Sequence, residues 1–221
     1  RSDPEVQTVV SDVLADIGRY TPGNALAFFP SYREAARYGQ RLQSNTAVSQ
    51  SIYIDDAETD TESLKQSFIS NGDAILCTSL WGTLTEGVSF DDDAARAVAV
   101  IGVGYPYLSE RTKAIEAAYD RAYSNDTNAG WQYGVEIPTI RKTRQALGRV
   151  IRSPEDYGVR LLIDKRYTKA STEMGKYGVR DAFPTEERTE FVDIAPEKVK
   201  YSMLNFFQQF DAYNGRHPHP E

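Results

Sequence analysis

The sequence predicts an α/β protein whose parallel sheet carries helices on both faces. Short apolar runs alternate along the chain with amphipathic segments, which is the pattern of βαβ units. Residues 97–103 form a nearly continuous apolar run rich in valine, as is typical of a parallel strand buried on both faces. The composition agrees, because 40% of the 221 residues are hydrophobic and 26% are charged.

The predicted strands share apolar character and end at proline, glycine or a polar residue; they are residues 24–29, 51–54, 73–78, 97–103 and 159–164. The predicted helices have apolar residues at helical spacing; they are residues 4–17, 31–42, 61–69, 109–123, 138–152 and 196–210. Ser31 with Glu34 three residues later predicts the start of the second helix. Ligands of such folds bind at the carboxyl ends of the strands. We therefore expect the site in the polar segments 30–32, 82–90 and 164–166.

Charge and cysteine content narrow the class of protein. A net charge of −7 argues against non-specific coating of nucleic acid, although the arginine-rich stretch 141–152 allows a local basic groove. The single cysteine, Cys77, excludes an internal disulfide and is expected to be a buried structural thiol. The absence of a long apolar run and of a signal-peptide pattern predicts a cytoplasmic protein without a membrane partner. The first residue is not Met, so we expect a fragment.

Residues 145–152 are predicted to form the last turns of the helix 138–152. Gln145, Arg149 and Arg152 stand four and three positions apart and would share one side of that helix. An amide and two guanidinium groups on one ridge suit an oxyanion such as a triphosphate, because arginine offers a planar fork of donors and stays charged. A solvated basic face is the alternative for the helix taken alone.

Three segments in order resemble the second motor domain of superfamily 2 helicases, and specifically the XPD family of DNA repair helicases. Residues 28–32 resemble motif IV, residues 82–90 motif V and residues 145–152 motif VI. Residues 104–107, 156–158 and 164–167 also match, so the resemblance extends over residues 24–167. It implies a RecA-like fold for residues 1–183, with extra carboxyl-terminal helices. Residues 184–221 would be an extension with one helix and a loose tail.

The resemblance also implies a function and residue roles. The parent protein would be an ATP-dependent 5′–3′ DNA helicase of the nucleotide excision repair type. Arg149 and Arg152 would approach the γ-phosphate of ATP as arginine fingers, and Gln145 would contact the nucleotide or the attacking water. Gly148 would allow close approach of the ligand. As an alternative, either arginine could pair with Asp156 or Asp164.

Motif V would contact DNA and couple it to the nucleotide. Its expected nucleotide-side residues are Glu86, Gly87 and Ser89, and Ser89 stands where the family has Asp, so only a serine hydroxyl is left to hydrogen-bond there. Thr83 and Thr85 would bind phosphates of single-stranded DNA. Tyr32, Tyr105 and Tyr107 are candidates for base stacking, with ordinary packing as the alternative. Asp164 and Arg166 are expected to form a structural ion pair.

The chain contains no phosphate-binding loop, no Asp-Glu-x-His box and no cysteine cluster. The resemblance assigns these features to the first motor domain, so ATP with Mg²⁺ would be bound mainly there and any iron–sulfur cluster would lie outside this chain. No metal site is expected here, and the chain alone is expected to be inactive. The implied partners are the first motor domain, single-stranded DNA and repair proteins.

Three alternatives stay open at this point. One is a related DinG-type helicase domain. Another is a non-catalytic binding module that docks a partner through the helix 196–210, whose aromatic residues are otherwise expected to pack in the core: Tyr201, Phe206, Phe207 and Phe210. The last is a metabolic α/β enzyme that uses Gly102-x-Gly104 as a nucleotide turn.

Overall fold

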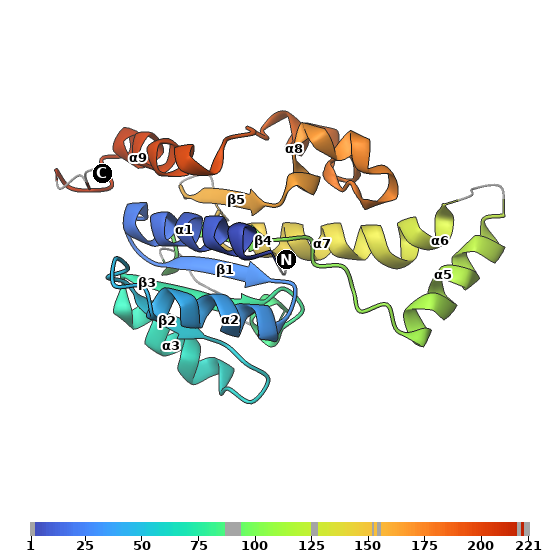
Figure 1. Cartoon of the computed structure of the whole chain (residues 1–221), viewed down its shortest axis with the longest axis horizontal. Coiled ribbons are helices and arrows are strands. Elements are labelled where there is room, and N and C mark those ends of the chain that lie inside the picture. The colour runs from blue at the N-terminus through green and yellow to red at the C-terminus, as the bar shows by residue number, and fades with distance from the viewer. Residues whose placement is uncertain are drawn as a thin grey trace. The chain divides into compact units, whose positions relative to one another are not determined.

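The computed structural model describes residues 3–86, 94–124, 128–151, 153, 156–215 and 218. Their strands form one sheet of five parallel strands in the order β2-β3-β1-β4-β5 (Figure 1). The strands are β1 Ala25–Phe29, β2 Ser51–Ile54, β3 Ala74–Ser79, β4 Ala97–Ile101 and β5 Val159–Ile163. The predicted α/β class, the five strands and their parallel arrangement are therefore confirmed.

The six predicted helices are present in order. The α-helices are α1 Pro4–Tyr20, α2 Tyr32–Gln43, α3 Thr61–Asn71, α4 Thr83–Glu86, α5 Glu110–Ala122, α6 Ala129–Trp131, α7 Ile137–Leu147, α8 Thr185–Thr189 and α9 Val199–Gln209. Helices α4, α6 and α8 were not predicted, and α4 lies in the segment 82–90 that was expected to be a loop. The π-helix η2 spans Gln132–Glu136, and the 3-10 segments are η3 Lys165–Tyr167, η4 Lys169–Tyr177, η5 Arg180–Ala182 and η6 Pro196–Lys198. No described helix combines the length and apolar character needed to cross a membrane.

The chain divides into two compact units. The first consists of residues 1–102, 146–163 and 194–221 and contains the whole sheet. The second consists of residues 103–145 and 164–193 and contains α5, α6, η2 and α8. The division of the sequence at residue 183 stays a prediction. The single helix expected in residues 184–221 is corrected, because both α8 and α9 lie there.

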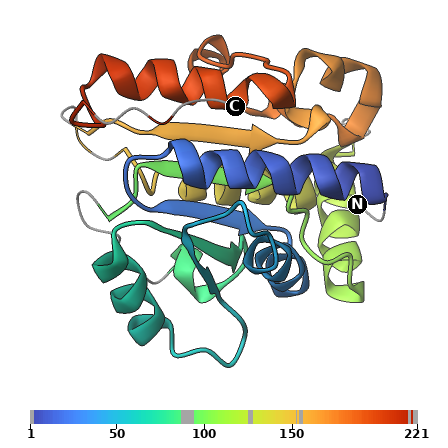
Figure 2. The same cartoon turned by 60° about the vertical axis from the view of Figure 1, so that its left-hand side comes forward.

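The three central strands of the sheet, β3, β1 and β4, are buried on both faces. Alternate residues of a strand point to opposite faces, and in β1 all five residues are buried. Ala27 and Phe29 join one continuous apolar core with residues of α1, α2 and α9, whereas Phe28 lies on the opposite face and is also buried. Helices α1 and α9 lie side by side over the first of these faces (Figures 1 and 2). Cys77 belongs to this core, which confirms the predicted buried thiol.

The predicted helix 138–152 is wrong at its end. Helix α7 ends at Leu147, and residues 148–150 form a turn in which Arg149 N donates to Ala146 O at 3.1 Å. Glycine has a low helix propensity, and the β-branched Val150 and Ile151 follow Gly148. Arg149 therefore does not share a helical ridge with Gln145.

The last predicted helix begins as the 3-10 turn η6 and continues as α9. Its buried residues Val199, Met203 and Phe207 recur every fourth position, as one face of a helix requires. The expected packing of the aromatic residues is confirmed for Phe207, and Phe206 packs against the same core. It is wrong for Tyr201 and Phe210, which are 47% and 48% exposed.

Candidate functional site

The carboxyl ends of β1 and β3 meet in the first unit, as the fold class predicts. Leu80 N donates to Phe29 O at 2.7 Å, which joins the two strand ends directly. The chain then turns sharply, with Gly82 N donating to Ser79 O at 3.0 Å and Thr85 N donating to Gly82 O at 3.1 Å. These bonds bring the motif IV segment and the motif V segment to the same edge of the sheet.

Tyr32 packs against the turn that follows β3. It is the first residue of α2, whose predicted N-cap Ser31 accepts a hydrogen bond from Glu34 N at 3.3 Å. A Cβ on Gly82 would come within 2.5 Å of Tyr32 Oη and 3.1 Å of Ser79 O. Glycine is therefore required for the approach of the tyrosine, and the two motif segments are in contact through this pair.

The two threonines of motif V have different surroundings. Thr83 is exposed at the first position of α4. Thr85 is fully buried, and its hydroxyl donates to Ser79 O at 3.0 Å. The predicted contact of the Thr85 hydroxyl with DNA is therefore corrected. Because this hydroxyl is buried and bonded to Ser79 O, it closes the turn and is out of reach of a ligand.

Arg149 links the motif VI segment to the motif V segment. Its Nη2 donates to the backbone carbonyl oxygen of Thr85, and its side chain is half-buried. The acceptor is a neutral carbonyl, so this contact orients the guanidinium without neutralising its charge. Asp156, one of the expected acidic partners, accepts a hydrogen bond from Ser153 N at 2.9 Å.

The structure describes only some of the other residues that were predicted to contact the nucleotide. Gln145, in the last turn of α7, and Gly148 are exposed. Glu86 is the last residue of α4. Arg152, Gly87 and Ser89 lie outside the described residues, so their predicted roles stay predictions.

The second unit contains the two other tyrosines. Tyr105 is half-buried, donates from Oη to Tyr177 O at 2.9 Å and lies 5.4 Å from the Trp131 ring. Burial raises its pKa, partly offset by Arg166. Tyr107 is 88% exposed, so its ring is open to solvent. Of these two, Tyr107 has the geometry that stacking on a base needs.

Asp164 and Arg166 form the expected ion pair. Nε donates to Oδ1 at 2.8 Å and Nη2 donates to Oδ2 at 2.6 Å, and this carboxylate raises the pKa of the arginine. Asp164 also accepts from Arg166 N at 3.0 Å, which caps η3. The pair therefore stabilises a local turn.

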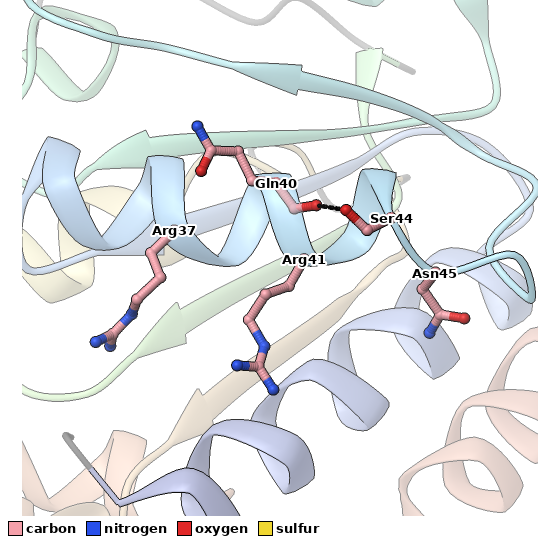
Figure 3. Close-up of a pocket in the computed structure, with 5 residues that line it drawn as sticks. All are labelled: Arg37, Gln40, Arg41, Ser44 and Asn45. Atoms are coloured by element: carbon pink, nitrogen blue, oxygen red, sulfur yellow. Dashed lines mark hydrogen bonds between the residues drawn. The ribbon is translucent and has the colours of Figure 1, made fainter.

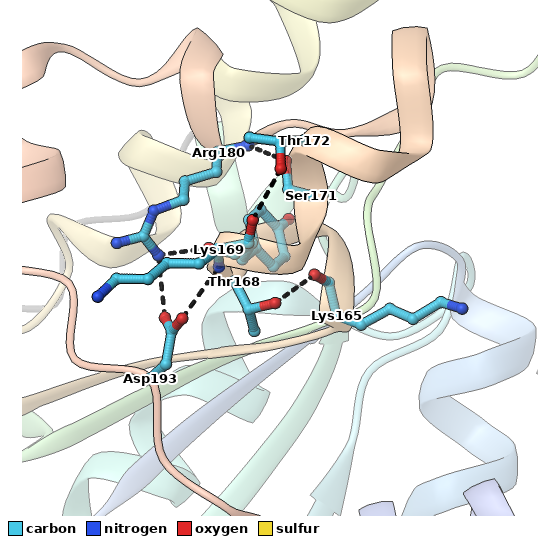
Figure 4. A network of polar contacts seen from close by, with 8 residues as sticks. Lys165, Thr168, Lys169, Ser171, Thr172, Arg180 and Asp193 are labelled. Atoms are coloured by element: carbon cyan, nitrogen blue, oxygen red, sulfur yellow. Dashed lines mark hydrogen bonds and ion pairs between the residues drawn. The ribbon is translucent and has the colours of Figure 1, made fainter.

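A second charged network links residues of the second unit between Tyr167 and Asp193 (Figure 4). Arg180 donates from Nη1 to Tyr167 O at 3.0 Å and to Asp193 Oδ1 at 2.9 Å. The other oxygen of Asp193 accepts from Lys169 N at 2.9 Å. Arg180 is 9% exposed, so losing its carboxylate partner would leave a largely buried charge. The network therefore stabilises this part of the second unit.

Sequence reasoning missed two residues near the strand ends. Trp81, in the turn before Gly82, is 38% exposed. Asp55, directly after β2, is 1% exposed and accepts from Thr78 Oγ1 at 2.5 Å. Burial raises the pKa of Asp55, and the bond from Thr78 opposes this shift. The signals available in the sequence were an acid directly after the strand β2 and an aromatic residue two positions after the end of β3.

Comparison of the sequence with known proteins finds similarity to helicases. The model of the helicase C-terminal domain family matches residues 14–177. The helicase subunit XPD of general transcription and DNA repair factor IIH from Schizosaccharomyces pombe is 29% identical over 180 residues, which are 77% of this chain and 23% of that protein. A regulator of telomere elongation helicase 1 homolog from Drosophila yakuba is 27% identical, over 77% of this chain and 19% of that protein.

Two solved XPD structures have the same fold. One is an XPD helicase with a TM-score of 0.63 and 22% identity, over 79% of this chain and 30% of its own. The other is an apo XPD with a TM-score of 0.63 and 24% identity, over 79% of this chain and 34% of its own. The chain spans about a fifth to a quarter of the length of the two curated relatives described above.

Proposed function

Since the chain belongs to the family of helicase C-terminal domains, as an XPD-type superfamily 2 member with a RecA-like fold, we propose that it is the second motor domain of an ATP-dependent DNA helicase. The parent protein moves 5′ to 3′ and acts in nucleotide excision repair, as the resemblance implies. Its first motor domain binds most of the ATP and Mg²⁺, and repair proteins are further partners.

The observation that carries this proposal is the contact between Arg149 and Thr85. It joins the segment proposed to face the nucleotide to the segment proposed to face DNA, within one compact unit. A shift of either segment would change the position of the other. Such a link is what a motor needs in order to couple hydrolysis to movement along a strand.

Arg149 fits the anionic phosphates of ATP. Its guanidinium does not deprotonate, and the carbonyl of Thr85 restricts its orientation. Arg149 and Arg152 would stabilise the negative charge that spreads over the transferred phosphoryl group, and Gln145 would contact the nucleotide or the water. Arginine fingers of this kind contribute about 10³–10⁵ in rate.

The DNA-facing residues of the proposal are Thr83, Tyr107 and Tyr32, together with backbone amides near Gly87. Thr83 and Tyr107 are exposed, so both are accessible to a strand. Tyr32 is only partly accessible to a strand, because the hydroxyl end of its ring lies against Gly82. Tyr105 would serve mainly as a packed support in its own unit.

Cys77 does not fit an iron–sulfur ligand, because clusters are bound by thiolates. Burial raises the pKa of the Cys77 thiol to about 12, so the thiolate is disfavoured. We therefore assign any cluster of the parent protein to residues outside this chain.

The test measures DNA-stimulated ATP hydrolysis by the intact protein. Arg149→Ala is expected to lower turnover about 10³-fold or more, and Arg149→Lys to recover little, because the ammonium lacks the planar fork. Arg144→Ala is the matched control: this arginine of α7 pairs with Glu187 at 2.5 Å and should leave turnover nearly unchanged.

Two results would contradict the proposal. Turnover by Arg149→Ala at the wild-type rate would remove the arginine-finger role. An intact wild-type protein that hydrolyses no ATP in the presence of DNA would favour a non-catalytic binding module. Duplexes with a 5′ or a 3′ single-stranded overhang test the polarity, since only the first should be unwound.

A further inference from the structure

Three arginines of α2 occur at four-residue intervals and lie on one side of the helix: Arg33, Arg37 and Arg41. We call them the α2 arginine ridge. The opposite side of α2 is buried against the sheet, and Arg33 and Arg41 are exposed. Figure 3 shows Arg37 and Arg41 leaving the helix on the same side.

The described contacts of this ridge bring little negative charge to it. Arg41 Nη1 donates to Gln7 Oε1, a neutral acceptor, at 3.1 Å. Arg37 Nη2 lies 3.5 Å from Glu34 Oε1, and the Arg37 side chain is 37% exposed, so this pair contributes weakly. Helix α2 thus carries three arginines and one acidic residue, Glu34, in a chain whose net charge is −7.

Helix stability does not account for the ridge. A cation in the last turn of a helix favours the helix dipole, which explains Arg41. Arg33 lies in the first turn, where a cation opposes the same dipole. Like charges four residues apart also repel each other. An anionic ligand would offset both costs.

Neutral donors adjoin the ridge. Arg37 and Arg41 line an open hollow of about 490 Å³ together with Gln40, Ser44 and Asn45. The Ser44 hydroxyl donates to Gln40 O at 2.8 Å, as Figure 3 shows. The single hydroxyl proton of Ser44 is thereby engaged. The side-chain amides of Gln40 and Asn45 lie beside the guanidinium groups, and amides of this kind are usual sequence-blind contacts to phosphate and sugar.

We propose that the α2 arginine ridge binds the phosphate backbone of single-stranded DNA, an inference that rests on the proposed helicase function. The ridge begins at the residue after Tyr32, at the strand-end edge where the DNA-facing residues are proposed. About 6 Å of helix axis separates successive members. Each strand of duplex DNA carries one charge about every 3.4 Å of helix axis. A single strand is more extended, so its phosphate spacing is comparable with the spacing of the arginines, and a strand along the ridge offers a phosphate to each of them.

The test measures the salt dependence of binding between the intact protein and a labelled oligo(dT). Fluorescence anisotropy at several salt concentrations gives the slope of log K against log[salt], whose magnitude is about 0.7 for each phosphate of a single strand that the protein neutralises. The triple variant R33Q/R37Q/R41Q is expected to lower the magnitude of this slope by about two. R33K/R37K/R41K, which keeps the charge, is expected to retain the wild-type slope.

The matched control K65Q/R160Q/K198Q removes three cations of the same unit from α3, β5 and η6 and should leave the slope unchanged. A wild-type slope for R33Q/R37Q/R41Q would overturn the proposal, and so would an equal reduction in the control. Binding of a labelled polyglutamate peptide that only the ridge variant loses, with the DNA slope unchanged, would assign the ridge to an acidic protein instead. Arg149→Ala should keep the wild-type slope while losing turnover, which separates failure of this inference from failure of the proposed function.

Discussion

The hydroxyl of Tyr32 lies against Gly82, so closely that a Cβ at position 82 would come within 2.5 Å of Tyr32 Oη and 3.0 Å of Cζ. Tyr32 begins the helix after β1, and Gly82 lies in the turn after β3. The pair therefore joins two segments 50 positions apart in the sequence at one edge of the sheet. Their packing positions the turn whose carbonyl at Thr85 accepts from Arg149.

Gly82→Ala is expected to destabilise the protein by about 1–3 kcal/mol, because the added methyl group overpacks this contact. The methyl group would also approach Ser79 O at 3.1 Å, a backbone atom that cannot move aside easily. Urea unfolding of the variant and the wild type measures the change in stability.

A double-mutant cycle with Tyr32→Ala identifies the cause. If the tyrosine is the main obstacle, Gly82→Ala should cost clearly less in the Tyr32→Ala background than in the wild type. Equal costs in both backgrounds would show that the ring does not require glycine at this position.

Asp55→Asn is expected to change how stability depends on pH. Burial raises the folded-state pKa of Asp55 above 3.8, so the folded state favours the protonated form and loses stability as the pH rises through that pKa. The amide does not ionise and removes this loss. The free energy of unfolding of Asp55→Asn minus that of the wild type should therefore be larger at pH 7 than at pH 4, which means that the variant gains relative stability as the pH rises.

Asp56→Asn provides a control of opposite sign. Hydrogen bonds from Thr59 and Glu58 lower the pKa of this exposed carboxylate, so its contribution to stability is present at neutral pH and is lost as the pH falls. The free energy of unfolding of Asp56→Asn minus that of the wild type should therefore be lower at pH 7 than at pH 3. Identical pH profiles for both variants would refute the assignment.

The Cys77 thiol is expected to be unreactive in the folded protein. It is completely buried, and burial raises its pKa to about 12, so almost no thiolate is present at pH 8. A thiol-reactive chromophore should label Cys77 only at the rate at which the protein unfolds, and rapidly in urea. Fast labelling in native buffer would show that this part of the sheet is open.

Tyr107→Ala is expected to weaken binding of single-stranded DNA by the intact protein about tenfold, because stacking on a base contributes about 1–3 kcal/mol. Tyr107→Phe keeps the ring and should bind nearly as well as the wild type. Tyr201→Ala, which removes an exposed tyrosine of α9, is the control and should have no effect. Equal affinities for Tyr107→Ala and the wild type would exclude stacking at this position.

Local pattern was sufficient for most of the fold. The apolar run in β4 predicted a strand buried on both faces, and Ser31 with Glu34 predicted the start of α2. The end of α7 was not predicted, because the apolar spacing of residues 146–151 suits a helix while Gly148 and the β-branched residues after it disfavour one. Pattern and propensity conflicted there, and propensity prevailed.

The candidate site was predicted less completely than the fold. Order along the chain located the motif segments, but it did not distinguish exposed Thr83 from buried Thr85. It also missed Asp55, whose bond to Thr78 forms only because β2 lies beside β3. Burial and pairing of this kind depend on neighbours that are distant in the sequence.

The sequence by itself determined the alternation of strands and helices and the parallel sheet, because these depend on periodicity. It also indicated the family, through the resemblance of three ordered segments to known motifs. Only the tertiary structure decided which polar groups are buried, which aromatic rings face solvent, and that Arg149 donates to the carbonyl of Thr85. These contacts form only where segments distant in the sequence pack together, as β1 and β3 do in the sheet, and local periodicity does not specify that packing.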